Sequence, residues 1–314
     1  MQTIFSERGL AVAPEPAVWA LGMFDGVHKG HAALIDIARK KALELSVKCG
    51  VFTFDLNPLG VIKPEAVPLS VVSLEGKLQL LASAGVEITV VEQFDGDFAA
   101  MSPKAFASEV LKRRLKARHV VVGYDYSFGS GGQGNTDTLV QLGPELGFGI
   151  TVVPQVQVDG STVSSSAIRA AIAAGDVERA RAMLGRPHFI EGIVEHGRGV
   201  GASMGIPTAN IALPEDIAIP EVGVYACFVR SDDGQRWPAL CNIGLRPTFH
   251  DEQRGIKCEA HIIGASMELY GRCLRVEFIR RLRGEAAFAS PEALMAQIRF
   301  DTAQALKILG TEVL

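Results

Sequence analysis

The chain has 314 residues, of which 48% are hydrophobic and 21% are charged, a composition typical of folded globular proteins that excludes a largely disordered chain. Its length suffices for two domains of about 150 residues each. The formal net charge of −4 gives no reason to expect tight, charge-driven binding to nucleic acid or to an anionic membrane surface.

Two further features predict a reducing, cytoplasmic setting. The first 25 residues include Glu7, Arg8 and Glu15 and lack the basic start and apolar centre of a signal peptide. The cysteines are odd in number and form no CxxC pair, so neither a disulfide framework nor a structural zinc site is expected. We expect them to be small buried apolar groups; they are Cys49, Cys227, Cys241, Cys258 and Cys273.

Predicted strands and helices alternate between residues 17 and 185. Apolar runs predict strands, and apolar residues at helical spacing predict helices between them. Ser73 and the Ser102-Pro103 pair have the character of helix starts. Alternation of this kind indicates parallel strands in a sheet covered on both faces. The predicted strands are 18–24, 49–54, 88–91, 119–123 and 149–153, with helical spacing over 34–45, a helix over 75–84 and another from 103.

Short strands separated by Gly, Pro, Asp and Asn dominate after residue 185. This pattern is typical of an antiparallel sandwich or small barrel, and a terminal helix over 291–309 follows the cap Ser290. The pattern changes near Gly185, which predicts domains over 1–185 and 186–314. The predicted strands of the second half are 189–196, 222–229, 239–244, 257–262 and 273–278.

The segment GMFDGVHKGH, residues 22–31, falls between the first predicted strand and the first predicted helix. A helix start after a parallel strand suits phosphate, because its N–H groups are free and its dipole is positive. Gly30 lets the backbone approach, and His28 and His31 can reach one phosphate and donate to a pentavalent phosphorus transition state. The alternative is a glycine turn with two surface histidines. Asp25 and the preceding buried strand argue against that alternative, and the spacing is not that of a Walker loop.

A second segment, SSSAIR at residues 164–169, is predicted to open a helix. Hydroxyls at a helix start, followed by Arg169, can hold the outer phosphates of a nucleotide. The alternative is a serine cap followed by a solvated arginine.

Several motifs in fixed order give the chain a resemblance over nearly its whole length. It resembles the bacterial bifunctional riboflavin kinase/FAD synthetase family. The matching motifs are FDGVHKGH (24–31), FDLNP (54–58), VVGYDYSFGSGGQG (121–134), SSSAIR (164–169), GDVERARAMLGRP (175–187), GIPTANI (205–211), GVYA (223–226), NIGLRPTF (242–249) and LYGRCLRVEFIRRLR (269–283).

The resemblance implies two activities on two domains. An N-terminal nucleotidyltransferase-type, Rossmann-like parallel-sheet domain would transfer AMP from ATP to FMN, giving FAD and pyrophosphate. A C-terminal antiparallel six-stranded β-barrel with a terminal helix would phosphorylate riboflavin with ATP. The substrates implied are riboflavin, FMN and ATP, with Mg²⁺ accompanying ATP. The oligomeric state stays open.

Residue roles in the first half follow from the same resemblance. His28 and His31 would stabilise the α-phosphate, Ser165 and Arg169 would grip the β and γ phosphates, and Asp125 would lie near the flavin or the ribose. The other residues expected to bind ATP or phosphate are Gly22, Phe24, Asp25, Gly30, Asn57 and Ser166, with Arg198 and Gly205 in the second half.

Roles in the second half are implied in the same way. Thr208 and Asn210 would bind Mg²⁺, which prefers oxygen donors and few protein ligands, and strand alternation puts both on one face. Glu259 would act as the base on the ribityl 5′-hydroxyl. The simpler alternatives are a turn before a strand and a solvent-facing glutamate. The remaining residues expected to bind flavin are Tyr225, Pro247 and Thr248.

One departure from the family pattern is Asn57, which stands where many members have histidine. Asparagine can hydrogen-bond a phosphate but carries neither a proton nor a positive charge. Three alternatives therefore stay open: mainly a riboflavin kinase with a weakened first domain, a non-enzymatic flavin-binding regulator on the same fold, and a nucleotidyltransferase for another phosphorylated small molecule.

Overall fold

The computed structural model describes residues 1–6, 11–196, 206–245, 255–265 and 267–310. The packing of the chain divides it into two compact units, and each is described here by itself. Unit 1 comprises Met1–Pro68 with Ser73–Ser164, and unit 2 comprises Leu69–Val72 with Ser165–Leu314. The helices between residues 165 and 184 thus pack with the second unit, and a domain boundary at residue 185 stays a prediction.

Unit 1 contains a six-stranded, fully parallel sheet with the order β1-β4-β3-β2-β5-β6. Its strands are β1 (Gln2–Ser6), β2 (Ala17–Leu21), β3 (Lys48–Phe54), β4 (Ile88–Glu92), β5 (Ala117–Gly123) and β6 (Gly149–Val153). Its helices are α1 (Lys29–Leu45), α2 (Leu59–Ile62), η1 (Pro64–Ala66), α3 (Leu74–Ser83), α4 (Gly96–Ala99), α5 (Pro103–Ala105), the π-helical η2 (Phe106–Arg114), η3 (Ser130–Gly132) and α6 (Thr136–Leu146), and a small hairpin joins β7 (Gln157–Val158) to β8 (Ser161–Thr162).

The predicted alternation of strands and helices in this half is confirmed. Ser73 and Ser102 cap their helices as expected, each accepting a backbone N–H three residues on. Two differences have physical reasons. The first strand ends at Leu21 instead of residue 24, because a tight turn with left-handed residues follows it. Strand β1 was not predicted, because its pairing is with β4, more than 80 residues away.

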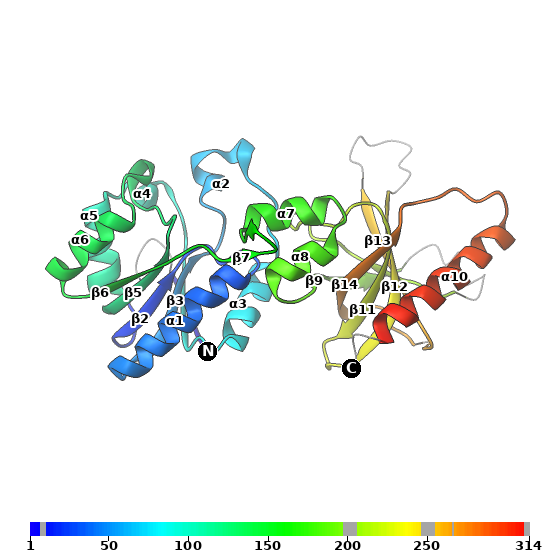
Figure 1. Cartoon of the computed structure of the whole chain (residues 1–314), viewed down its shortest axis with the longest axis horizontal. Helices are drawn as coiled ribbons and strands as arrows, with labels where there is room; N and C mark the ends of the chain where they lie inside the picture. Colours follow the sequence, from blue (N-terminus) through cyan, green and yellow to red (C-terminus); the bar gives the residue numbers. More distant parts are fainter. Residues whose placement is uncertain (7–10, 197–205, 246–254, 266, 311–314) are drawn as a thin grey trace. The chain divides into compact units, whose positions relative to one another are not determined.

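Helices cover both faces of the sheet (Figure 1). On one face, Leu34 and Ile35 of α1 and Leu81 of α3 pack with Val18 of β2. On the other face, η2 and α6 pack against Trp19 and its neighbours, and the Trp19 indole N–H donates to Leu115 O at 2.8 Å. The strand order reverses between β2 and β5, so the carboxyl ends of these strands form the switch point at which open α/β sheets bind ligands.

Unit 2 contains a closed antiparallel barrel with the strand order β10-β13-β12-β11-β14-β9. A six-stranded barrel is what the family resemblance implied. The elements of this unit are α7 (Ser165–Ala173), α8 (Val177–Leu184), β9 (His188–Glu195), β10 (Ala209–Ile211), β11 (Gly223–Ser231), β12 (Arg236–Leu245), β13 (Ile256–Ile262), β14 (Cys273–Arg283) and α10 (Pro291–Gly310).

The terminal helix α10 packs on the outside of the barrel. Ser290 caps it, as predicted, by accepting the Ala293 N–H at 3.3 Å. Its residues Ala305 and Leu309 bury themselves against Phe228 and Leu240 of the barrel. Helix α10 therefore closes one side of the barrel and leaves the outer face of the neighbouring strand β13 open for chemistry.

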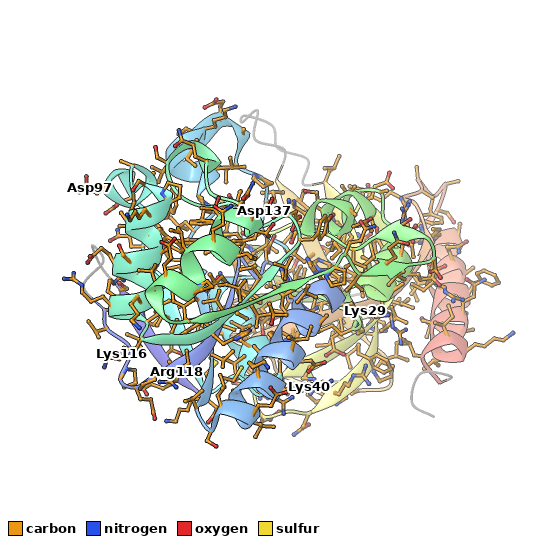
Figure 2. The ribbon with its side chains drawn as sticks, turned by 60° about the vertical axis from the view of Figure 1, so that its left-hand side comes forward. Lys29, Lys40, Asp97, Lys116, Arg118 and Asp137 are labelled. Atoms are coloured by element: carbon orange, nitrogen blue, oxygen red, sulfur yellow. The ribbon has the colours of Figure 1, made fainter. Side chains whose placement is uncertain are left out.

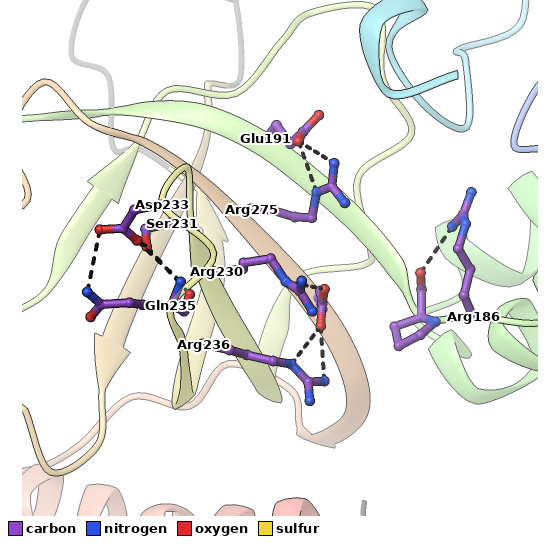
Figure 3. Close-up of polar contacts among 10 residues, drawn as sticks. Arg186, Glu191, Arg230, Ser231, Asp233, Gln235, Arg236 and Arg275 are labelled. Atoms are coloured by element: carbon purple, nitrogen blue, oxygen red, sulfur yellow. Dashed lines mark hydrogen bonds and ion pairs between the residues drawn. The ribbon is translucent and has the colours of Figure 1, made fainter. Parts of the chain in front are cut away.

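Another part of the outer barrel surface carries ion pairs between neighbouring strands (Figure 3). Arg275 meets Glu191 at 2.8 Å, while Arg230 and Arg236 converge on the Glu277 carboxylate at 3.4 and 3.0 Å. Partly exposed pairs of this kind contribute at most about 1 kcal/mol each to the free energy of unfolding.

The cysteines are all free thiols, and four are buried as expected. Cys273 is exposed, which corrects the expectation for that residue. It is the first residue of β14 and pairs with Ile193, another exposed residue, so both side chains lie on the outer face of the barrel.

Candidate functional site

The turn after β2 has a strained backbone. Phe24 and Val27 have φ values of 51° and 40°, and Gly26 has 78°. Left-handed conformations in non-glycine residues are uncommon, cost free energy and cluster at functional sites. Phe24 is fully buried and anchors the turn. The turn therefore brings the chain abruptly from the end of a central strand to the start of α1.

His28 begins helix α1 as its N-cap, and Lys29, labelled in Figure 2, is the first helical residue. The His28 side chain is 6% exposed, and its Nδ1 accepts the His31 backbone N–H at 3.2 Å. Because Nδ1 accepts, the proton of the neutral ring lies on Nε2, which is left as a donor. A Cβ atom at Gly30 would come within 3.0 Å of the His28 ring, so glycine is required there.

The two histidines form a stacked pair. Their ring centroids lie 3.6 Å apart with 13° between the ring planes, and Phe24 packs on His31 at 4.9 Å. Burial lowers the pKa of His28 to about 4. Burial, with the nearby His28 and Lys77, holds the pKa of His31 well below 6.5. Within the described residues, His31 Nδ1 is buried without a hydrogen-bond partner, so this pair presents a neutral donor and an unsatisfied ring nitrogen.

The neutral pair predicts an acid-sensitive unit 1. Unfolded histidine binds a proton near pH 6.5, whereas buried His28 does so only near pH 4. Between these values the unfolded state binds more protons, so the stability present above pH 6.5 is lost as the pH falls. For His28 alone we expect a loss of about 3 kcal/mol in the free energy of unfolding.

Urea titrations at several pH values will measure this loss through the fluorescence of Trp19, in a chain whose other tryptophan is removed by Trp237→Phe. His28→Asn keeps an N-cap acceptor but does not titrate, so it should flatten the pH dependence. An unchanged slope in this variant would show that other groups cause the acid sensitivity.

Two more predicted residues lie at the carboxyl ends of the central strands. Asn57 follows β3, and its Oδ1 accepts the Leu59 N–H at 3.0 Å, so its amide NH₂ is the group left to face a phosphate. Asp125 is exposed just after β5. Since β3 and β5 flank β2 in the sheet, the turn, Asn57 and Asp125 share one edge of unit 1.

The SSSAIR segment opens α7, as predicted. Arg169 Nη2 donates to Ser166 Oγ at 3.1 Å, so this arginine is held on the first turn of the helix. Within unit 1, Val163 O would lie 3.9 Å from a Cβ atom at Gly30. The chain therefore passes the histidine turn two residues before Ser165.

In unit 2, strand pairing brings three polar residues into one row. Glu259 of β13 lies opposite Asn210 of β10 on one side and opposite Asn242 of β12 on the other. Directly paired residues point to the same face, and the alternate residues Cys258 and Ala260 fill the barrel core. The row therefore lies on the outer face of the barrel, where Glu259 and Asn210 are brought together as predicted.

Charged groups border this row. Lys257 Nζ lies 3.2 Å from Glu259 Oε2. A Cβ atom at Gly244 would come within 2.5 Å of Glu285 Oε1 and 2.9 Å of Lys257 Cε. Gly244 therefore leaves the room in which these side chains gather around Glu259.

Thr208 lies beside a small apolar pocket at the end of the barrel. The pocket is also lined by Ala260, Ile262, Leu269 and Tyr270, among others. His261 is held by its Nδ1, 2.9 Å from Pro207 O. The segment from 207 to 210 thus joins an apolar pocket to the polar row of Glu259.

Not every predicted residue can be placed at a site. Arg198, Gly205, Pro247 and Thr248 lie outside the described residues. Tyr225 is completely buried in the barrel core, and its hydroxyl donates to Glu221 O. In this conformation it has no surface to offer a flavin, so its flavin role stays a prediction.

Sequence reasoning missed Lys77 in unit 1, and Asn242, Lys257 and Glu285 in unit 2. Asn242 belongs to the NIGLRPTF motif, which gave a signal without a role. The other three had none, because a charged residue in an amphipathic helix, or at the edge of a strand, is usually solvated.

The fold and these two constellations define a two-unit, nucleotide-dependent transferase. Family models place both parts: the FAD synthetase model matches residues 11–167 and the riboflavin kinase model matches residues 184–309. Bifunctional riboflavin kinase/FMN adenylyltransferases from Escherichia coli K12 and Bacillus subtilis 168 are 35% and 36% identical, covering 99% and 93% of this chain and 98% and 92% of their own lengths. The chain belongs to the bifunctional riboflavin kinase/FMN adenylyltransferase family.

A solved structure also shares this architecture. It is titled as a macrolide-efflux protein from Streptococcus pneumoniae, and it matches with a TM-score of 0.89 and 29% identity over 96% of this chain and 97% of that one. Among the residues described here, no helix has the length and apolar character needed to cross a membrane.

Proposed function

We propose that this protein makes FAD from riboflavin in two ATP-dependent steps. Unit 2 phosphorylates riboflavin to FMN, and the site at the carboxyl edge of the unit 1 sheet then transfers AMP from ATP to FMN, releasing pyrophosphate. The observation that carries the proposal is the buried, stacked His28–His31 pair at the sheet's switch point. It is supported by full-length kinship to bifunctional relatives.

In the adenylyl transfer, an FMN phosphate oxygen attacks the α-phosphorus of ATP and the bond to pyrophosphate breaks. His28 Nε2–H donates to an α-phosphate oxygen as negative charge builds there, and His31 adds a second ring nitrogen. Asn57 contributes its NH₂ group and Asp125 orients the flavin or ribose. Ser165 and Arg169 hold the leaving pyrophosphate. No proton has to move, because the attacking phosphate is already ionised at neutral pH.

In the kinase step, Glu259 accepts the proton of the riboflavin 5′-hydroxyl as its oxygen attacks the γ-phosphorus. The apolar pocket beside Thr208 suits the flat, apolar part of a nucleotide or flavin. Lys257 keeps the Glu259 carboxylate in place until substrate arrives.

The residues around Glu259 fit a magnesium ion. The Thr208 hydroxyl and the Asn210 amide oxygen are neutral oxygen donors next to a carboxylate, the chemistry that Mg²⁺ prefers, with the rest of its shell filled by phosphate and water. When bound, Mg²⁺ neutralises and orients the ATP phosphates. We propose that Thr208 and Asn210 hold it.

The experiment is a time course. The purified chain is incubated with riboflavin, ATP and MgCl₂, and the flavins are separated at intervals, with EDTA in place of MgCl₂ as the control. FMN should appear first, and FAD and pyrophosphate should follow after a lag. A mixture that holds only riboflavin would contradict enzymatic activity and favour a flavin-binding regulator.

A second candidate is a riboflavin kinase whose adenylyl transfer is weak. The observation that favours it is the neutral Asn57, whose Oδ1 is already engaged by Leu59. FMN accumulation without FAD would support this candidate, provided that Asn57→His then restores FAD formation. No change in this variant would count against it.

A further inference from the structure

A buried lysine lies behind the histidine turn. Lys77 of α3 is 5% exposed, and its Nζ donates to Phe54 O at 2.7 Å, to Thr53 Oγ1 at 3.3 Å and to Met23 O at 3.4 Å. Thr53 Oγ1 in turn donates to Met23 O at 2.9 Å. One ammonium group therefore ties the end of β3 to the turn that follows β2. Burying a lysine costs several kcal/mol unless it is hydrogen-bonded, and here it has three acceptors.

The charges around Lys77 give this ammonium a function beyond packing. His28 and His31 are neutral, and the side chain at position 57 is a neutral amide. The carboxylates that face Lys77 belong to Asp25 in the histidine turn and Asp55 after β3, and from α1 it faces the His31 ring. Without the ammonium, an anionic nucleotide at this edge would meet two carboxylates and two backbone carbonyl oxygens. Lys77 offsets this negative potential at short range, where screening by water is weak.

We propose that Lys77 is a positioning residue for adenylyl transfer: its ammonium is the fixed positive charge behind the phosphate turn, and it holds the Met23 and Phe54 carbonyls in place. The inference rests on the proposed adenylyl transfer. Because all three ammonium protons are engaged by the protein, Lys77 acts through the turn and through its field, without touching the substrate.

The same burial makes this charge sensitive to alkali. Desolvation lowers the pKa of Lys77 to about 8, against the opposing pull of Asp25 and Asp55. Below about pH 8 the ammonium is present, and above it the charge is lost. FAD formation should therefore decline above about pH 8, whereas the kinase reaction, which takes place on another core, should not share this decline.

The test measures kcat and KM for ATP in FAD formation from supplied FMN between pH 6 and 10, with riboflavin phosphorylation by the same preparation as the control. Wild type should show an alkaline limb near pH 8 in FAD formation. Lys77→Met should lower kcat about 10- to 100-fold and abolish the limb. Lys77→Arg should keep most of the activity and move the limb to higher pH, which a purely structural role would not do.

Three outcomes would overturn the inference. One is a wild-type profile of FAD formation that is flat to pH 10, which needs no variant and decides the matter even if Lys77→Met fails to fold. The second is a folded Lys77→Met protein, judged by Trp19 fluorescence, with wild-type kcat and pH profile. A wild-type chain that makes no FAD at any pH would overturn the proposed adenylyl transfer, and this inference with it, whereas either of the first two leaves the proposed function intact.

Discussion

Alanine at position 28 is expected to lower the rate of FAD formation from FMN and ATP by about 10²- to 10³-fold. His28 is held as an Nε2–H donor by the hydrogen bond that its Nδ1 accepts from His31, so removing the ring removes a donor already aimed for the transition state. Riboflavin phosphorylation by the same preparation should change less than about twofold, because the two units have separate cores. Product separation from each substrate measures both rates.

The matched control separates chemistry from helix capping. His28→Ala also removes the N-cap of α1, which costs about 1 kcal/mol of stability. His28→Asn restores a cap acceptor without an imidazole, so it should recover stability, measured by the Trp19 unfolding signal, and remain as inactive as alanine in FAD formation. Substantial activity in His28→Asn would show that His28 serves only the helix. An equal fall of both reactions in either variant would contradict separate sites.

The sequence predicted the histidine turn because its signals are local. A buried strand, glycines and a helix start occur within 15 residues of each other, so periodicity alone places His28 and His31 at the end of a central strand. In the second half, the resemblance paired Glu259 with Asn210, and the structure supplies the reason: they are opposite residues on β13 and β10.

Lys77 could not be predicted, because its role depends on contacts made after folding. In α3 it stands between Glu75 and Gln79, where a lysine is normally solvated. Only the packing of α3 against the ends of β2 and β3 buries it. The same holds for Glu92 and Arg114, a buried ion pair that joins β4 to the end of η2. Pairs of this kind need a partner distant in sequence, which periodicity does not reveal.

Glu259→Gln is expected to lower kcat for FMN formation by about 10²- to 10⁴-fold, the range for removal of a general base. Glutamine keeps the size and hydrogen-bonding capacity of the side chain but cannot take the proton of the 5′-hydroxyl. Riboflavin binding, measured by quenching of flavin fluorescence, should stay within about threefold, because glutamine still offers an oxygen acceptor of the same reach. FAD formation from supplied FMN should be unchanged, since it takes place on unit 1.

The control must account for the ion pair that Glu259 makes with Lys257. Both side chains are about 30% exposed, so losing the pair itself should change the free energy of unfolding by at most about 1 kcal/mol. Glu277→Gln removes a comparable ion-pair partner from the outer barrel surface, that of Arg230 and Arg236 (Figure 3), and should leave FMN formation intact. If Glu277→Gln were as slow as Glu259→Gln, the loss would reflect barrel electrostatics. If Glu259→Gln kept wild-type turnover, Glu259 would not be the base.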